Sequence, residues 1–411
     1  MRLNEGNIAS KHSAAFAVVV AALGYFVDIY DLVLFSIVRV PSLKGLGYSG
    51  DELLQVGISL LNAQMIGMLI GGILWGIMGD KKGRVSVLFG SILMYSLANI
   101  ANGFVQGATS YAVLRFIAGV GLAGELGVSV TLVAESMPKE KRGWGTTIIA
   151  TVGVMGAVVA GLVVDKFSWR NAYFIGGAMG LLLLVLRYYV IESGMFCKMK
   201  ETTVSRGNFL YLFSNKERFK RYLNCIVVGV PSWFVVGILV TFSPEITQAL
   251  GAPELVNAGT AVMYCYAGLV IGDLSSGALS QYVKSRKLPI YLFLTITAIS
   301  CLVYLNIPHS SALLTYIVCL CMGVGIGYWA VFVMTAAEQF GTNLRATVTT
   351  TVPNFVRGAV VLLTSLFQYL RPQYGIITAA YLVGAFCLFS AFYSAYRLNE
   401  SFHNDLEFVE E

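Results

Sequence analysis

The chain has 411 residues, of which 57% are hydrophobic and only 12% are charged. A soluble protein carries roughly a quarter charged residues, so this chain has too few charges to cover a water-facing surface, and lipid is the expected solvent. The net charge is +6, but the basic residues are spread over many short segments, so no nucleic-acid partner is expected.

Twelve apolar runs are each long enough to cross a bilayer as a helix of about twenty residues. They lie at residues 13–38, 55–79, 86–105, 110–134, 145–165, 171–191, 223–243, 256–282, 288–306, 312–336, 347–369 and 374–396. Strand-like alternation with polar residues, the barrel signature, is absent. We therefore expect an all-α integral membrane protein. The longest polar interruption, 192–222, predicts an N-terminal six-helix bundle over 1–191, a linker, and a C-terminal six-helix bundle over 223–411.

The lysines and arginines predict the orientation in the membrane. Twenty of them fall in the termini and loops of one side, five fall on the other side, and three lie inside spans. Because cytoplasmic loops collect such residues, both termini and the 192–222 linker are expected in the cytoplasm. We expect a multi-pass monomer of the cytoplasmic (inner) membrane.

The residue pattern does not indicate a metal site, a cofactor site or a nucleotide-binding site. Histidine occurs only at 12, 309 and 403, and no pair of the seven cysteines has zinc or redox spacing. No nucleotide-binding motif is present, so ATP is not the energy source of this chain. We expect neither an enzyme nor a cofactor.

Three segments occur twice in the chain, and the two copies are separated by nearly the same number of residues in each case. The charged turn "GIMGDKKGR" at 76–84 has a worn counterpart, "GALSQYVKSRK", at 277–287. "GVGLAG" at 119–124 meets "GVGIG" at 323–327, and "AESMPKEKRGWGTT" meets "AEQFGTNLRATVTT", so that Glu135 and Arg142 have the spacing of Glu338 and Arg345. Two six-helix halves related by a parallel repeat are a transporter architecture.

The charged turn can be interpreted physically. Gly76 follows another glycine by four residues, a spacing that lets helix backbones approach closely, and Gly83 permits a turn that a side chain would strain. Asp80 can face the positive end of a neighbouring helix, and Arg84 can pair with a carboxylate. The alternative is that the cations only satisfy the charge bias of cytoplasmic loops. The second copy has Gln281 in place of the aspartate, so the same contact is not expected there.

"GIMGDKKGRVSVL" resembles the cytoplasmic loop motif of the major facilitator superfamily, Gly-x-Leu-x-Asp-Arg-x-Gly-Arg, and the duplicated Glu…Arg loops match the same superfamily. The resemblance covers essentially the whole chain. It implies a major facilitator fold, alternating access, and a gate latch carried to Asp80 and Arg84. The complete set of expected gate residues is Gly76, Asp80, Gly83, Arg84, Glu135, Arg142, Glu338 and Arg345.

Charged residues inside the predicted spans need a reason, because each costs at least about 2.5 to 3.5 kcal/mol at mid-bilayer. These residues are Asp28, Asp31, Arg115, Glu125, Asp273 and Arg357. Asp28 and Asp31 share one helical face. Arg115 lies about 15 Å along the helix from Glu125, so it needs a partner from another span. Arg187, near the end of its span, is expected to extend its head group to the surface.

"FVDIYDLVLF" and "RFIAGVGLAGELGVSVTLVAESMPKEKRG" resemble the metabolite:proton symporter branch of the superfamily. The matching positions are Tyr30, Asp31, Leu34 and Phe35 in span one, and Arg115, Gly119, Gly124 and Glu125 in span four. Asp28 is an additional acid, and Ala123 stands where glycine is commoner. The resemblance implies uptake of carboxylates such as citrate, oxoglutarate or shikimate, or of zwitterions such as proline and betaine.

The leading interpretation is proton-coupled symport of a small organic metabolite, a carboxylate in the simplest case. Asp31 and Glu125 would bind the proton with help from Asp28 and Arg115, and the proton gradient would drive transport. Arg357 would hold a substrate carboxylate, with hydrogen bonds from Asn354 and Tyr30. Alternatively, the acids are structural partners of Arg115 or Arg357.

Two further functions stay open at the level of sequence. A carrier of a cationic or zwitterionic solute (amino acid, betaine or polyamine) suits the three acids, but Arg357 would repel a cation. A proton-coupled exporter or a sensor has no sequence feature in its favour. The identity of the substrate does not follow from the residues.

Overall fold

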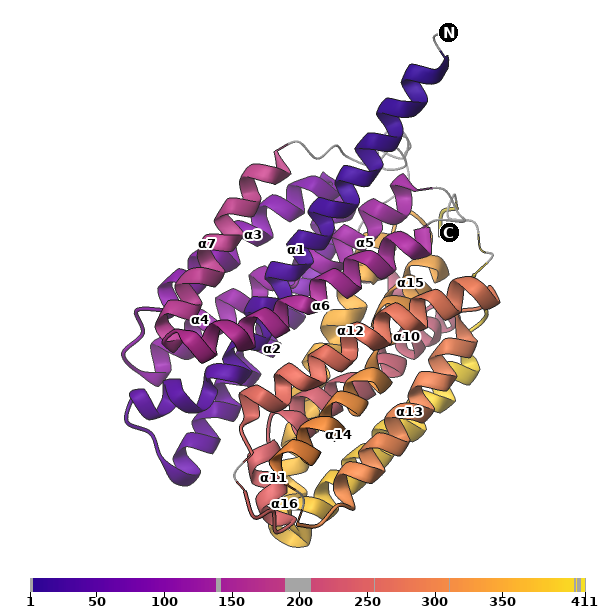
Figure 1. Ribbon diagram of the computed structural model, residues 1–411. Helices are drawn as coiled ribbons and strands as arrows, with labels where there is room; N and C mark the ends of the chain where they lie inside the picture. Colours follow the sequence, from indigo (N-terminus) through magenta and orange to yellow (C-terminus); the bar gives the residue numbers. More distant parts are fainter. Residues whose placement is uncertain are drawn as a thin grey trace.

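The computed structural model describes residues 3–137, 142–188, 208–254, 256–309, 311–402, 404 and 408–410. The elements in these residues are all helices. The first seven helices lie side by side in one half of the molecule, and those from residue 211 onward lie in the other half (Figure 1). Both chain termini lie at the same end of the bundle, here called the terminal end, and the opposite end is called the far end.

The first half contains α1 to α7. Their bounds are α1 Leu3–Gly45, α2 Gly50–Lys82, α3 Arg84–Asn102, α4 Ala108–Leu122, α5 Glu125–Ser136, α6 Arg142–Lys166 and α7 Trp169–Arg187. The other half contains α9 Tyr211–Ser214, α10 Lys216–Phe234, the π-helix η1 Val235–Val240, α11 Ser243–Ala249, α12 Ala258–Val283, α13 Lys287–Leu305, α14 Ala312–Ile326, α15 Trp329–Gln339 and α16 Arg345–Arg397.

The predicted spans agree with these helices. Within the described residues, eleven helical stretches are long and apolar enough to cross a membrane. The last of them, α16, contains two predicted spans, 347–369 and 374–396, and its helix is broken at Gly375, the second residue of the latter span, where φ is 79°. The main difference is α1, which begins at Leu3 and ends at Gly45, well beyond the predicted 13–38. Residues 189–207, most of the predicted linker, lie outside the described part.

Two of the spans are interrupted at equivalent places. The span of α4 and α5 breaks at Ala123 and Gly124, and that of α14 and α15 breaks at Gly327 and Tyr328. Such breaks release backbone groups that need partners within the protein, because lipid offers none. Trp75 Nε1 donates to Val120 O at 2.6 Å in the first half. In the second half, Ala330 N donates to the Asp273 carboxylate at 3.1 Å, so the buried Asp273 has a structural reason.

Glycines allow α2 to pack closely on two helices at once. A Cβ added at Gly67 would lie 2.2 Å from Phe116 O of α4, and one added at Gly76 would lie 3.0 Å from Thr347 Cα of α16. The small residues of α2 therefore bring the two halves of the protein into contact, as their spacing predicts.

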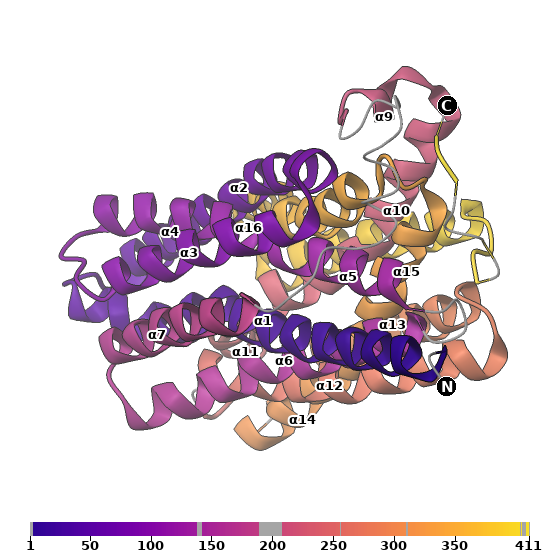
Figure 2. The same cartoon turned by 90° about the horizontal axis from the view of Figure 1, so that it is seen from above.

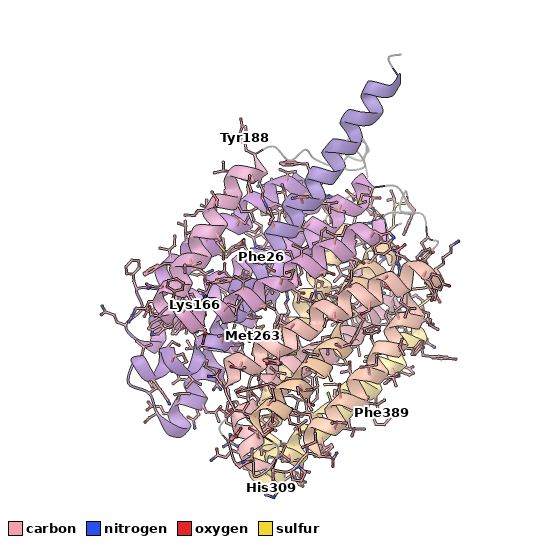
Figure 3. All side chains as sticks on the ribbon, viewed as in Figure 1. Phe26, Lys166, Tyr188, Met263, His309 and Phe389 are labelled. Atoms are coloured by element: carbon pink, nitrogen blue, oxygen red, sulfur yellow. The ribbon has the colours of Figure 1, made fainter. Side chains whose placement is uncertain are left out.

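The outer surface of the bundle is apolar. Side chains such as Phe389, which is 78% exposed, point away from the protein (Figure 3). Tyr188 lies near the terminal end of the molecule, whereas His309 lies at the far end (Figure 3). An exposed apolar belt between two polar ends is the surface that a bilayer requires.

Candidate functional site

The charged turn after α2 contacts the beginning of α16 in the other half. The Asp80 carboxylate accepts hydrogen bonds from Ala346 N at 3.2 Å, Thr347 N at 2.8 Å and the Thr347 hydroxyl at 2.6 Å. These are free backbone donors at a helix N-terminus, where the helix dipole also favours an anion. Asp80 thus faces the positive end of a neighbouring helix. We call this contact the α16 latch.

Arg84 and Gly83 complete the turn. Gly83 has φ 108° and ψ 157°, a conformation open to glycine and costly for other residues. Arg84 lies 3.4 Å from Asp80 and 3.0 Å from Glu135, and Glu135 is in turn 3.3 Å from Arg345 at the start of α16. These side chains are buried, so the network joins the two halves in a medium that strengthens electrostatic contacts.

The second half repeats half of this arrangement. Arg286 and Glu338, the counterparts of Arg84 and Glu135, form a buried ion pair at 2.8 Å. Arg286 is not among the gate residues expected from the sequence, although "VKSRK" in the second copy of the turn contains it. Gln281 replaces the aspartate and lies against Gly143. The side chain of Arg142, another expected gate residue, lies outside the described residues.

A different contact joins the halves at the far end. Arg39 of α1 lies 3.3 Å from Glu245 of α11 and 5.3 Å from the centre of the Phe242 ring. Arg39 is buried, whereas Glu245 is partly exposed. Arg39 was not predicted as an interface residue, because an arginine at the end of a span is typical of the protein surface. Polar contacts therefore close the interface at both ends of the molecule.

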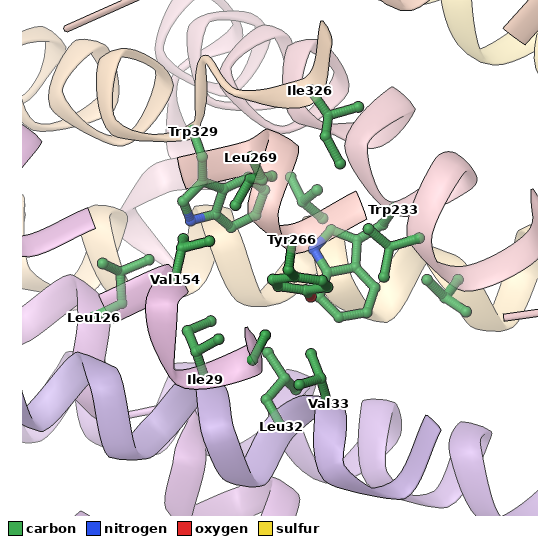
Figure 4. Close-up of a cluster of buried hydrophobic side chains, with 14 of the residues drawn as sticks. Ile29, Leu32, Val33, Leu126, Val154, Trp233, Tyr266, Leu269, Ile326 and Trp329 are labelled. Atoms are coloured by element: carbon green, nitrogen blue, oxygen red, sulfur yellow. The ribbon is translucent and has the colours of Figure 1, made fainter. Parts of the chain in front are cut away.

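A small cavity lies between the two closed ends. Its water-accessible volume is about 20 Å³, room for about one water molecule. Aromatic rings dominate its wall, and Figure 4 shows Trp233, Tyr266 and Trp329 facing Ile29 and Val154 across the interface. In this conformation the halves enclose a central site from both ends.

Arg357 of α16 is the charged side chain among the described cavity-lining residues. Its guanidinium lies 3.8 Å from Asp28, 3.5 Å from the Tyr25 hydroxyl and 5.8 Å from the centre of the Trp329 ring. Within the described residues, Arg357 Nε is a buried donor without a hydrogen-bond partner, and Trp329 Nε1 lies beside the Tyr25 hydroxyl. An unused buried donor beside a cavity can bind an acceptor such as a carboxylate.

The two residues expected to assist Arg357 are positioned differently. Asn354 accepts from Arg357 at 3.4 Å, but its amide nitrogen donates to Ala123 O, in the break after α4, at 2.7 Å, so it bridges the halves. Tyr30 donates to Ala172 O of α7 at 2.9 Å and does not line the cavity. Tyr25, five residues earlier on α1, lies beside Arg357 instead.

Asp28 and Asp31 are both fully buried. Asn99 of α3 lies beside Asp31, and neither Asp28 oxygen has a hydrogen-bond donor among the residues that the structure describes. Asp28 has Arg357 nearby, whereas Asp31 packs against α7, where a Cβ at Gly176 would lie 2.2 Å from its Oδ1. A buried carboxylate with few donors is costly in the ionised form, so both positions need a reason within the protein.

Glu125 has a partner that was not expected. Its carboxylate forms a buried ion pair with Arg187 of α7, so Arg187 does not extend to the surface as predicted. Gly24 of α1 makes room for the pair, because a Cβ there would lie about 2 Å from both side chains. Arg187 was expected at the surface because it lies near the end of a span, but in the structure it is the partner of Glu125.

Arg115 finds its partners in α3, in another span as expected. It donates to Asn99 at 2.6 Å and to Asn102 at 3.2 Å, and it lies 4.8 Å from the centre of the Tyr173 ring. Amide oxygens and a ring face hold this guanidinium, rather than a carboxylate in direct contact.

The chain is similar to known proteins over most of its length. The family described as Major Facilitator Superfamily matches residues 15–363. A Haemophilus influenzae protein provisionally assigned as a metabolite transporter is 29% identical over 349 residues, which cover 80% of this chain and 83% of the relative. The cis,cis-muconate transport protein of Acinetobacter baylyi is 25% identical over 367 residues, 84% of each chain. The proton:xylose symporter XylE has the same fold, with a TM-score of 0.77 at 15% identity over 97% of this chain and 98% of that one.

Proposed function

We propose that this chain carries a small organic carboxylate together with protons. The premise is that it belongs to the Major Facilitator Superfamily and is a secondary transporter. The proposed direction is uptake across the cytoplasmic membrane, with the terminal end in the cytoplasm. The muconate relative supports the substrate class, since muconate is a dicarboxylate.

Arg357 carries this proposal. It is a buried guanidinium that faces an aromatic cavity and keeps an unused donor. A guanidinium binds a carboxylate through two parallel hydrogen bonds, and Trp329 can add a third donor. A cationic solute would meet Arg357 in the same cavity, which disfavours the cation carrier considered from the sequence. The cavity is far smaller than the roughly 300 Å³ of a typical ligand site, so binding needs the halves to separate at one end.

We propose that Asp28 and Asp31 carry the coupling proton, and that Glu125 is mainly the structural partner of Arg187. Asp28 lies beside Arg357, so a substrate carboxylate on Arg357 would displace a counter-ion from Asp28 and favour its protonation. A monoanion entering with one proton crosses without net charge, so it accumulates on the pH difference alone, about tenfold for one pH unit.

The test is uptake into proteoliposomes. A panel of labelled aliphatic and aromatic carboxylates, amino acids and polyamines is offered with and without an imposed pH gradient. We expect a carboxylate to accumulate only when the exterior is more acidic. Accumulation of a polyamine, or of a carboxylate without any dependence on the gradient, would contradict the proposal.

Asp31→Asn and Asp28→Asn test the coupling. Each mimics a permanently protonated acid, so we expect loss of uphill uptake with retained exchange of substrate, which needs no proton release. Asp273→Asn is the matched control, because Asp273 is a buried acid that caps α15. Normal pH-driven accumulation in both aspartate variants would remove these residues from the coupling mechanism.

A further inference from the structure

A second polar cavity lies at the terminal end, away from the central site. It has a volume of about 290 Å³ and lies between the start of α10, the ends of α15 and α16, and the last residues of the chain. Four cations line it, together with two carboxylates. The cations are Arg218, Lys220, Arg221 and Arg397. Figure 2 shows α9 near the C-terminus at this end of the molecule.

The cavity already holds an anionic group of the protein itself. Glu410 Oε1 accepts from Arg221 at 2.7 Å, and Oε2 accepts from Arg218 at 3.3 Å. The Glu410 backbone exchanges two hydrogen bonds with Asn343, of 2.9 and 3.1 Å. Thr342 N donates to Phe408 O at 2.9 Å. The contacts of Glu410 thus indicate that the cavity accommodates an anion with at least two acceptor oxygens.

Exposed apolar side chains lie beside these cations on the same helices. Phe219 and Leu223 of α10 are 36% and 43% exposed, and Leu223 lies one turn from Lys220. Tyr393, one turn before Arg397 on α16, is 64% exposed. Such side chains face lipid in a protein of this kind, so the cavity lies where acyl chains end and headgroups begin.

We propose that this cavity binds the phosphate-bearing headgroup of an anionic phospholipid, and that Glu410 is an internal competitor for it. Basic pockets between membrane helices bind such headgroups because the phosphate finds several charged donors at the height of its own leaflet. The phosphate would contact Arg221 and Lys220, and the acyl chains would lie along Phe219 and Leu223. Inorganic phosphate offers the same chemistry without the chains, and the experiment separates the two.

The experiment measures thermal unfolding and lipid binding of the purified full-length protein in detergent. The probes are phosphatidylglycerol, phosphatidylcholine and inorganic phosphate. We expect saturable stabilisation by phosphatidylglycerol only. Lys220→Gln and Arg221→Gln should each weaken its binding about fivefold. Glu410→Gln should strengthen it, because the competing charge is removed.

Lys284→Gln is the matched control, since Lys284 is an exposed cation at the same end and outside the cavity. It should bind phosphatidylglycerol like the parent. Lys220 is partly exposed and pairs with Glu217 of the same helix at 2.9 Å, so Lys220→Gln tests the site even if Arg221→Gln fails to fold. Equal binding of both lipids, parental binding in Lys220→Gln, or equal stabilisation by inorganic phosphate would each overturn the proposal.

Discussion

Replacing Asp80 with asparagine tests the α16 latch. The substitution preserves the shape of the side chain but removes the charge and turns one acceptor oxygen into a donor nitrogen. That nitrogen would face one of the backbone donors of Ala346 or Thr347, which now bind the carboxylate at 3.2 and 2.8 Å. Arg84 would lose its 3.4 Å contact as well, although it keeps Glu135.

The magnitude follows from these contacts. A hydrogen bond to a charged group contributes about 1.5–3 kcal/mol, and an anion at a helix N-terminus adds up to about 2 kcal/mol. Water replaces part of this when the end opens. We take about 3 kcal/mol as the loss to the closed state, which corresponds to roughly a hundredfold change in the ratio of closed to open molecules.

Labelling of a single cysteine measures that ratio. Thr350 is a suitable position, because it is fully buried in α16 against Gly127 of the other half, and its hydroxyl has no hydrogen-bond partner in the described structure. The background should replace all seven native cysteines, so that the introduced thiol alone reacts. We expect Asp80→Asn to raise the labelling rate at Thr350→Cys strongly.

Lys81→Gln is the control for this experiment, since it removes an exposed charge of the same turn and leaves the latch intact. Its labelling rate should match that of the parent. If Asp80→Asn also labels and transports like the parent, the turn serves only the charge bias of the loop, and the reasoning is wrong.

Four other predictions follow from single sites. Arg357→Lys keeps the charge but loses the two-pronged geometry, so carboxylate affinity in a binding titration should fall at least about tenfold, with Arg357→Gln weaker still. Glu125→Gln leaves Arg187 buried without its counter-ion and should lower the free energy of unfolding by about 3 kcal/mol, whereas replacing both residues with apolar ones should recover most of it in thermal unfolding. Gly83→Ala should cost about 1–3 kcal/mol because φ is 108°, and it should raise cysteine labelling at the terminal end. Burial raises the pKa of Glu400, but hydrogen bonds from a serine hydroxyl and from backbone N–H groups outweigh it and leave the pKa lowered. The stabilisation from Glu400 is therefore present above the ordinary carboxyl pKa and is lost as the pH falls through the lowered value, which limited proteolysis of the C-terminal tail should detect.

The sequence predicted those features that depend on residue type at a fixed spacing. The glycines of α2 permit close packing wherever that helix lies, and an aspartate after a helix needs donors that a neighbouring N-terminus supplies. The repeat predicted two halves and even marked Arg286, whose role appears once Glu338 is seen beside it.

Partners between spans could not be predicted, because they depend on how each helix is rotated about its own axis. Tyr25 and Tyr30 both lie on α1, yet only Tyr25 reaches Arg357, and Tyr30 turns to α7. Likewise Arg187 could reach the surface or point inward. The choice depends on Glu125 lying across from it, with Gly24 leaving the space for the pair.

The central cavity of about 20 Å³ bears on the return half of a transport cycle. A carrier that moves solute in one net direction must change sides while unloaded, so its empty form has to pass through a state that is shut at both ends. An obligate exchanger avoids that state, because its two halves do not close over the binding site until a solute occupies it. Here the rings of Trp233, Tyr266 and Trp329 fill the centre themselves and leave space for about one water molecule. For the uptake cycle proposed above, this packing means that substrate is not needed to complete the shut form, so an unloaded return to the side of collection is expected.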